Sequence, residues 1–195
     1  MPSFRNAPGA TPLGDVSHLI PQHLQTQAQL DEFEARNIAQ AARKYLLKHR
    51  KFSFTVAFLK RVHKEMFGET WVWAGIYRDA SMNLGVEPMQ IQVEMYKLSK
   101  DIEYWEKENT LNLLERSVRL HHRLVKIHPF PNGNGRHARF VSDIYLFGRG
   151  EKMPTWPNQE LVEHTDIRAR YIRAMQAADK GDYKQLEAFT QDLIK

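Results

Sequence analysis

The chain of 195 residues contains no cysteine, so it can form no disulfide bond and can use no thiolate as a nucleophile or metal ligand. It also lacks an apolar run long enough to span a bilayer. Met1 to Arg5 are not followed by the apolar stretch of a signal peptide. Because a cysteine-free chain suits a reducing compartment, we expect a protein that stays in the cytosol.

Neither sign of charge is in large excess. The 28 Lys and Arg residues against 23 Asp and Glu residues give a net charge of +5, which suits an anionic partner such as a nucleotide, a phosphoprotein or a nucleic acid. A net charge of this size does not distinguish among these three kinds of partner. One group of basic residues is expected to form a solvated helix face, with a nucleic-acid-binding surface as the alternative interpretation. These residues are Arg43, Lys44, Lys48, Arg50 and Lys51.

Residues that break regular structure are concentrated at the N-terminus. Residues 1–25 are rich in proline and glycine, which predicts an extended N-terminal arm rather than a packed element. Residues 26–195 contain neither an internal repeat nor a low-complexity tract. Their length suits one domain with a substantial apolar core.

Apolar residues recur at spacings of three or four through most of the chain, which is typical of amphipathic helices. The pattern predicts helices over residues 29–48, 53–67, 93–108, 111–127, 135–147, 159–180 and 184–194. Between Trp73 and Val93 the periodicity breaks, and the segment predicts a small β-hairpin. The expected fold class is therefore mostly α with one hairpin.

The most informative stretch runs from His128 to Arg139 and reads HPFPNGNGRHAR. Its glycines let backbone N–H groups approach an anion closely, and apolar periodicity that resumes at Phe140 indicates that the turn leads into the N-terminus of a helix. The sequence therefore predicts a phosphate-binding turn. Histidine titrates near neutral pH, so His128 is the natural general base of such a site.

This stretch resembles the signature of the Fic/Doc family, HxFx(D/E)GNGRxxR, with Asn132 where most members carry an acidic residue. The variant is similar to a bacterial subgroup called mobile mystery protein B. The likeness extends to Trp71–Arg78 upstream and to Tyr171–Tyr183 downstream, so it covers most of the chain. It implies a Fic-like helical bundle with a small β-hairpin flap beside the active-site loop.

The resemblance implies a protein adenylyltransferase that uses ATP. His128 would take the proton from a Ser, Thr or Tyr hydroxyl of a target protein, and the hydroxyl oxygen would attack the α-phosphate of ATP and expel pyrophosphate. The phosphates are expected on a cradle of backbone N–H groups and on two guanidinium groups on one side of the following helix. These residues are Gly133, Asn134, Gly135, Arg136 and Arg139.

Further roles follow from the same resemblance. Phe130 is expected to be an apolar pin that locks the loop into the core. The flap would hold the target by strand-like pairing, through Asp79, Ala80, Ser81, Met82, Asn83, Leu84 and Gly85. Many members carry an inhibitory glutamate in an (S/T)xxxE(G/N) helix. The chain has no strict match, and the nearest candidate is Glu34, which could approach Arg139, with a solvated helix-face charge as the favoured alternative.

Asn132 replaces an acidic residue that normally binds the Mg²⁺ bridging the phosphates. An amide oxygen is still a hard ligand, but it lacks the charge. Three interpretations stay open: a lower affinity for Mg²⁺ or Mn²⁺, a metal that relies more on triphosphate oxygens, or a different reaction. The alternatives to AMP transfer are therefore a Doc-like phosphotransferase and a catalytically weak, nucleotide-gated binding protein.

Overall fold

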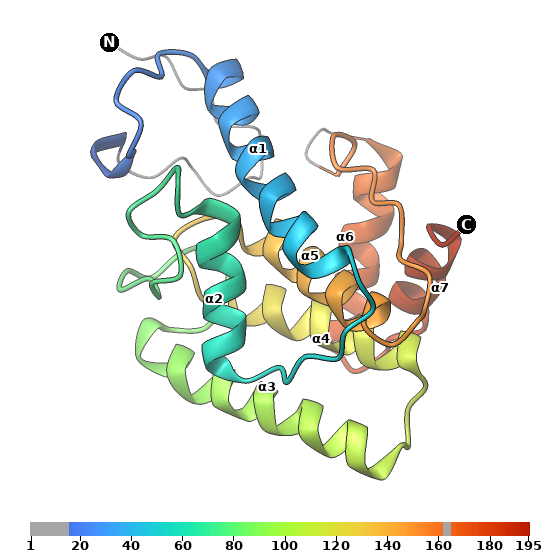
Figure 1. The fold of residues 1–195 in the computed structure, drawn as a ribbon. Coiled ribbons are helices and arrows are strands. Elements are labelled where there is room, and N and C mark those ends of the chain that lie inside the picture. The colour runs from blue at the N-terminus through green and yellow to red at the C-terminus, as the bar shows by residue number, and fades with distance from the viewer. Residues whose placement is uncertain (1–15, 162–164) are drawn as a thin grey trace.

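The computed structural model describes residues 16–161 and 165–195. In these residues one 3-10 helix, Val16–His18, precedes the α-helices (Figure 1), which are α1 Gln27–Leu46, α2 Val56–Phe67, α3 Pro88–Glu108, α4 Leu113–Ile127, α5 Asn134–Phe147, α6 Asp166–Asp179 and α7 Lys184–Asp192. The described residues form no β-strand, and one isolated β-bridge pairs Leu19 with Trp71. The mostly α fold class is confirmed.

The helices begin where the sequence supplies N-terminal caps. Thr26, Thr55 and Asn112 each accept a hydrogen bond from the backbone N–H three residues later, at the starts of α1, α2 and α4. The α3 helix begins at Pro88, before the predicted start at residue 93, because the fixed φ of proline suits the first position of a helix. The α6 helix begins later than predicted. Residues 158–161 form a turn instead, and Thr165 caps the helix.

The structure does not form the expected hairpin between Trp73 and Val93; residues 76–87 are an irregular loop. The carbonyl groups of Ala80 and Val86 accept hydrogen bonds from the Arg78 side chain instead of from a partner strand. Gly85 has a φ of 99°, which a regular strand excludes. The predicted flap is therefore a loop.

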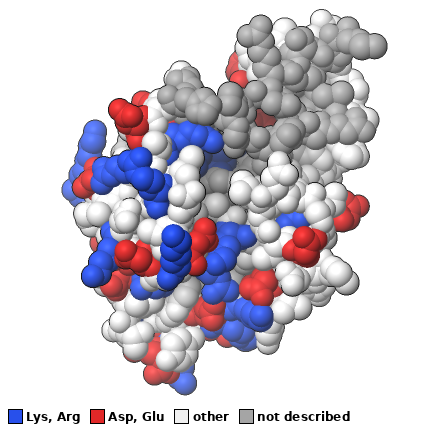
Figure 2. All heavy atoms as spheres, turned by 180° about the vertical axis from the view of Figure 1, so that it is seen from behind, with Lys and Arg blue, Asp and Glu red and all other residues white. Residues whose placement is uncertain are grey.

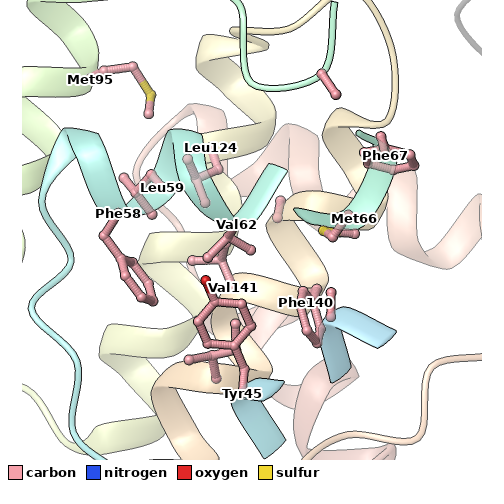
Figure 3. Close-up of a cluster of buried hydrophobic side chains, with 14 of the residues drawn as sticks. Tyr45, Phe58, Leu59, Val62, Met66, Phe67, Met95, Leu124, Phe140 and Val141 are labelled. Carbon is pink, nitrogen blue, oxygen red and sulfur yellow. The ribbon is translucent and has the colours of Figure 1, made fainter. Parts of the chain in front are cut away.

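The α4 and α5 helices form the central pair, with α1, α2 and α3 packed around one part of it and α6 and α7 around another (Figure 1). The main core joins α1, α2, α4 and α5 through large apolar side chains (Figure 3), including Tyr45, Phe58, Val62, Leu124 and Val141. Each fully buried side chain of this kind contributes about 1.5 to 3 kcal/mol to the stability of the fold. This core sets the position of the loop between α4 and α5.

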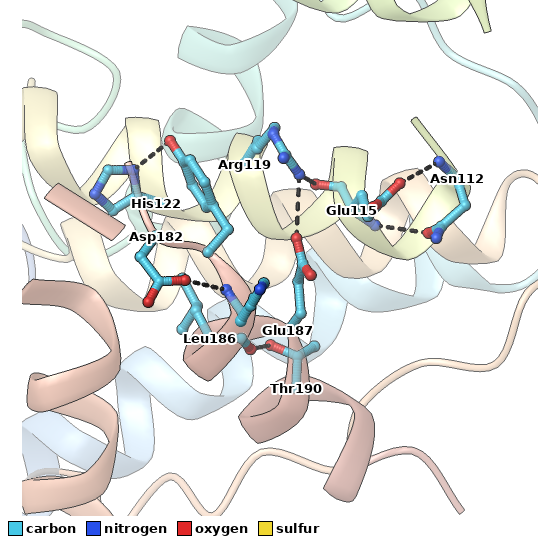
Figure 4. Close-up of polar contacts among 10 residues, drawn as sticks. Asn112, Glu115, Arg119, His122, Asp182, Leu186, Glu187 and Thr190 are labelled. Atoms are coloured by element: carbon cyan, nitrogen blue, oxygen red, sulfur yellow. Dashed lines mark hydrogen bonds and ion pairs between the residues drawn. The ribbon is translucent and has the colours of Figure 1, made fainter. Parts of the chain in front are cut away.

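The C-terminal helices attach to α4 through a smaller core and through polar contacts (Figure 4). Leu186 of α7 is fully buried. Arg119 Nη1 lies 3.2 Å from Glu187 Oε1, and the Tyr183 hydroxyl lies 3.2 Å from His122 Nδ1. These contacts hold α7 and the end of α6 against α4.

The described part of the N-terminal arm docks on the core. Leu19 and Leu24 are buried, and the Ile20 N–H donates to the Thr70 carbonyl at 2.9 Å. Residues 1–15 of the predicted arm lie outside the described residues. The division between arm and domain at residue 25 stays a prediction.

Basic and acidic side chains are interspersed on the face opposite to the view of Figure 1 (Figure 2). The basic residues at the end of α1 and just after it are exposed: Arg43, Lys44, Lys48, Arg50 and Lys51. Their exposure is compatible with both a solvated face and a nucleic-acid-binding surface. Across the described residues, no helix combines the length and the apolar character needed to cross a membrane.

Candidate active site

The loop 128–133 brings the predicted base and the predicted phosphate cradle into one turn. The α4 helix ends at Ile127, and His128 follows it in the left-handed conformation, with φ of 52° and ψ of 58°. This conformation is unfavourable for a residue with a Cβ by about 1 to 2 kcal/mol, so the surroundings must maintain it. Gly133, with φ of 76°, then caps the N-terminus of α5.

One hydrogen bond sets the tautomer of the His128 ring, the predicted base. Its Nδ1 lies 3.4 Å from the Val125 carbonyl oxygen, which can only accept, so Nδ1 carries the proton and Nε2 is the basic nitrogen. Desolvation lowers the pKa of His128, the Val125 hydrogen bond raises it, and the positive charge of Arg78 lowers it further. At neutral pH the imidazole is therefore in the form that accepts a proton.

Two residues of the motif hold the loop in place. Phe130 is fully buried and stacks on the His63 ring, with ring centroids 3.6 Å apart. Asn134 forms two hydrogen bonds with the Phe130 backbone, in which Oδ1 accepts from the N–H at 2.9 Å and Nδ2 donates to the carbonyl at 2.7 Å. The Asn134 side chain therefore shapes the loop, and its contribution to an anion site comes from the backbone.

His63 of α2 supports the loop and was not singled out from the sequence. Its Nδ1 accepts from the Gly75 N–H at 3.0 Å, so Nε2 carries the proton and donates to the Asn132 carbonyl at 3.0 Å. Burial, and secondarily His137 and the Arg136 charge, hold the pKa of His63 well below its usual value. In the sequence, His63 is a lone polar residue on an apolar helix face, a pattern that favours a core role over a site role.

The predicted anion cradle lies at the start of α5. The N–H groups of the first turn of a helix have no intrahelical acceptor, and the helix dipole favours negative charge at this end. The first helical bond of α5 runs from the His137 N–H to the Gly133 carbonyl at 2.8 Å. The amides of Asn134, Gly135 and Arg136 precede it and are the donors available to a phosphate.

Asn132 lies beside this cradle, but the chain alone does not build a metal site around it. Its Oδ1, the atom that would bind a metal, accepts a hydrogen bond from the Gly133 N–H at 2.6 Å. Within residues 16–161 and 165–195, no three His, Cys, Asp or Glu side chains are grouped to hold a metal ion. The residues present therefore do not fit a protein-built Mg²⁺ site.

Arg136 and Arg139 line a cavity of about 670 Å³ between α1, α5 and the 156–159 segment. The Arg136 guanidinium lies 4.8 Å from the centroid of the Phe67 ring and forms an ion pair with Glu34 of α1. The Trp71 Nε1–H donates to the other oxygen of Glu34 at 2.6 Å. One acidic side chain is therefore held directly against one of the two predicted phosphate ligands.

This finding corrects two expectations about Glu34. The residue is only 7% exposed, so its interpretation as a solvated helix-face charge is wrong. Its partner is Arg136 rather than Arg139. The side chain is drawn inward because Trp71 and Arg136 both offer it donors, and the sequence spacing of α1 shows neither.

Arg139 is buried among residues from the C-terminal part of the chain. Arg139 is only 8% exposed, and the Trp156 ring centroid lies 6.0 Å from its Cζ. Asp143, one turn further along α5, accepts from Trp156 Nε1–H at 2.9 Å, and desolvation raises its pKa to about 8. Burial therefore disfavours the charged form of Asp143 next to Arg139.

The loop that was expected to be the flap lies directly beside His128. A Cβ placed on Gly85 would come within 2.6 Å of the His128 Cβ, so the two backbones are in close contact. Leu84 is 60% exposed, so its side chain contributes little to the core. The remaining predicted flap residues lie along the same loop between Arg78 and α3: Asp79, Ala80, Ser81, Met82 and Asn83.

Residues 53–146 match the Fic/DOC family, and this segment contains α2 to α5 with the whole motif, apart from the last residue of α5. The "Protein adenylyltransferase Fic" of Drosophila grimshawi is 25% identical over 146 residues, which cover 73% of this chain and 29% of that protein. The chain thus spans less than a third of the length of that relative.

Solved structures of Fic domains share the fold. The N-terminal FIC domain of the Bep8 protein from Bartonella sp. 1-1C matches with a TM-score of 0.69 and 18% identity, over 95% of this chain and 94% of that one. The BepC protein from Bartonella tribocorum, solved with bound AMPPNP, matches with a TM-score of 0.66 and 18% identity, over 93% and 97% of the two chains. Residues 53–146 therefore form a Fic/DOC family domain, and the solved Fic domains share its fold.

Proposed function

We propose that this protein is a protein adenylyltransferase that moves AMP from ATP to a Ser, Thr or Tyr hydroxyl of a target protein. The observation that carries the proposal is the state of His128, a neutral imidazole whose Nε2 is basic, on the same loop as the anion cradle of α5. The adenylyltransferase relatives and the nucleotide-bound BepC structure support ATP as the substrate.

The proposed reaction needs little covalent chemistry from the protein. His128 Nε2 takes the hydroxyl proton while the hydroxyl oxygen attacks the α-phosphorus, and the bond from that phosphorus to pyrophosphate breaks. The amides at the start of α5 and the Arg136 and Arg139 guanidinium groups stabilise charge on the phosphate oxygens. The AMP–protein ester and pyrophosphate are the products.

A divalent cation, Mg²⁺ or Mn²⁺, is proposed to arrive with ATP. Since Asn132 offers one neutral oxygen that the Gly133 N–H already engages, the cation would depend on phosphate oxygens. No step of the reaction is assigned to it. The cytosolic location and the mobile mystery protein B subgroup likewise stay predictions from the sequence.

We propose further that Glu34 restrains the enzyme. A phosphate that approaches Arg136 meets the Glu34 carboxylate already bound there, and two like charges at that distance repel. Trp71 holds the carboxylate in this position through its indole N–H. Binding of the outer phosphates therefore requires Glu34 to leave Arg136.

A second function is favoured by one observation at Asn132. Its amide oxygen binds the Gly133 N–H, which borders the cradle, and it brings no charge for a metal ion. A phosphotransferase in which the nucleotide binds in the reversed orientation, as in Doc-like members, needs a different set of contacts at this point. A protein that binds ATP without turnover is the remaining alternative.

The position of the label on ATP distinguishes these functions. The protein is incubated with lysate proteins and ATP labelled at either the α or the γ phosphate, with Mg²⁺ or Mn²⁺. Protein-bound α label without γ label supports adenylyl transfer, and γ label without α label supports phosphoryl transfer. Binding of ATP measured by calorimetry, with neither label transferred, supports the binding protein.

A further inference from the structure

The Arg78 guanidinium is buried at the base of the 79–87 loop, and all of its donor nitrogens face backbone carbonyl groups. Nε donates to the His128 carbonyl at 2.7 Å, Nη1 donates to the Ala80 carbonyl at 2.8 Å, and Nη2 donates to the Val86 carbonyl. Only 5% of the residue is exposed. One side chain thus joins both arms of the loop to the residue that carries the base.

Backbone hydrogen bonds connect the same segments. The Arg78 N–H donates to the Pro129 carbonyl at 3.0 Å, and the Val86 N–H donates to the Ile127 carbonyl at 3.3 Å. Together with the Arg78 Nε bond to His128, three consecutive carbonyl groups, 127 to 129, accept hydrogen bonds from residues 78 and 86. The loop is therefore bonded to the chain on both sides of the base.

This arrangement matters because His128 has an unfavourable backbone conformation. Its left-handed φ of 52° is maintained by neighbours rather than by its own preference. The Nε bond fixes the orientation of the His128 carbonyl, and the ring direction depends on that backbone. A planar guanidinium with donors at fixed angles can hold three carbonyl groups at once, which an ammonium group on a flexible stem cannot.

We propose that Arg78 is a positioning residue, whose guanidinium holds the 79–87 loop and His128 as one unit. A target segment bound along the loop would then present its hydroxyl at a constant place relative to the base. The part of this inference that concerns the target rests on the proposed transferase function, whereas the part that concerns the loop and His128 rests on geometry alone. Arg136 and Arg139 lie on α5 with other partners, so ATP binding is expected to be independent of Arg78.

Amide hydrogen exchange tests the structural part without any substrate. In Arg78→Ala, the backbone N–H groups of residues 78 and 86 are expected to lose about tenfold or more of their protection against exchange. The substitution keeps the backbone atoms of both hydrogen bonds, so such a loss would come from the missing guanidinium. The Trp71 N–H, which donates to Phe67 at 2.8 Å, is the internal reference and should be unchanged. Unchanged protection of Val86 would show that the guanidinium does not hold the loop.

Transfer of α label from ATP to lysate proteins tests the functional part. Arg78→Ala is expected to lower transfer by about tenfold or more and to leave the Kd for ATP within about twofold. Arg78→Lys should recover little, whereas methylguanidinium added to Arg78→Ala should restore part of the transfer. Arg173→Ala, on the exposed face of α6, is the matched control and should behave like the wild type.

Gly85→Ala gives a second test that keeps the guanidinium. The new Cβ would lie 2.6 Å from the His128 Cβ and 2.7 Å from Arg78 Nη2. It must push the loop away from both groups, so transfer should fall while ATP binding persists. Full transfer by both Arg78→Ala and Gly85→Ala would overturn the proposal.

If the wild type transfers no α label, the proposed function fails, and hydrogen exchange still decides whether Arg78 holds the loop. If Arg78→Ala does not fold, Arg78→Lys and Gly85→Ala carry the same comparisons.

Discussion

The carboxylate of Glu34 and the guanidinium of Arg136, which are 102 positions apart in the chain, form an ion pair at the edge of the anion cradle. The Glu34 side chain is nearly buried, while the Arg136 side chain is 36% exposed, and both residues line the same cavity. A nucleotide that uses Arg136 must therefore replace a carboxylate by a phosphate.

Replacement of Glu34 by glutamine is expected to raise ATP affinity and transfer by roughly 10-fold. The substitution removes the negative charge that competes with phosphate for Arg136, and a hydrogen bond between charged groups contributes about 1.5 to 3 kcal/mol. Glutamine retains an oxygen that can accept from Trp71. Calorimetry with ATP measures the affinity. Glu32→Gln, an exposed neighbour on the same helix, serves as control. Equal ATP affinities for Glu34→Gln and the wild type would show that Glu34 does not restrain the site.

Loss of the Arg136 guanidinium should weaken binding of ATP more than binding of AMP, because the outer phosphates are expected to lie on it. For Arg136→Ala the Kd for ATP should rise by about tenfold or more, as expected for a charged hydrogen bond of about 1.5 to 3 kcal/mol. The effect should be larger in the Glu34→Gln background, in which the guanidinium is available. Equal losses for ATP and AMP would place Arg136 away from the outer phosphates.

Without its imidazole, the His128→Ala variant should lose transfer by about 10² to 10⁴-fold and retain ATP affinity within about twofold, since a general base acts on the rate rather than on ground-state binding. Quantitative labelling with α-labelled ATP and calorimetry measure the two quantities. His23→Ala, which changes an exposed histidine, is the control. Transfer at the wild-type rate by His128→Ala would exclude His128 as the base.

The pH dependence of transfer follows from the lowered pKa of His128. The base must be neutral, and desolvation with the Arg78 charge places its pKa below the usual value of about 6.5. The rate should therefore stay constant as the pH falls to about 6.5 and decline only below that point. A profile of kcat/KM against pH measures this limb. A decline that begins above about pH 7 would contradict a desolvated His128 as the base.

Asn132→Glu tests the departure from the acidic consensus. If the protein is an attenuated adenylyltransferase, the carboxylate should tighten Mg²⁺-dependent ATP binding and raise AMP transfer, because it supplies the charge that an amide lacks. Calorimetry at several Mg²⁺ concentrations, with Asn132→Gln as the uncharged control of equal size, separates charge from length. Lower transfer with unchanged metal dependence would indicate that Asn132 serves a different nucleotide orientation, and would favour the phosphotransferase.

Local patterns in the sequence were enough for the presence of the helices, though not for the starts of α3 and α6, and for the turn between α4 and α5. Capping residues such as Thr26 and Asn112 act on the N–H three positions later, and apolar periodicity is a property of a few consecutive turns. The motif from His128 to Arg139 is equally local, which is why the glycine turn and the helix start could be predicted together. The predicted hairpin is absent, because the Arg78 guanidinium satisfies loop carbonyl groups that a strand ladder would otherwise use.

Only tertiary packing decided which charges meet at the candidate site. Glu34 reaches Arg136 because α1 packs beside α5, and His63 reaches the Asn132 carbonyl because α2 lies under the loop. The raised pKa of Asp143 likewise depends on its burial in the folded chain, while the hydrogen bond from Trp156 of a separate segment lowers it. Hydrogen bonds and desolvation act over a few ångströms in space, and no spacing along the chain reports that distance. The sequence by itself therefore determined which residues the loop carries, and the packing of α1, α2 and the 79–87 loop decided which groups lie against them.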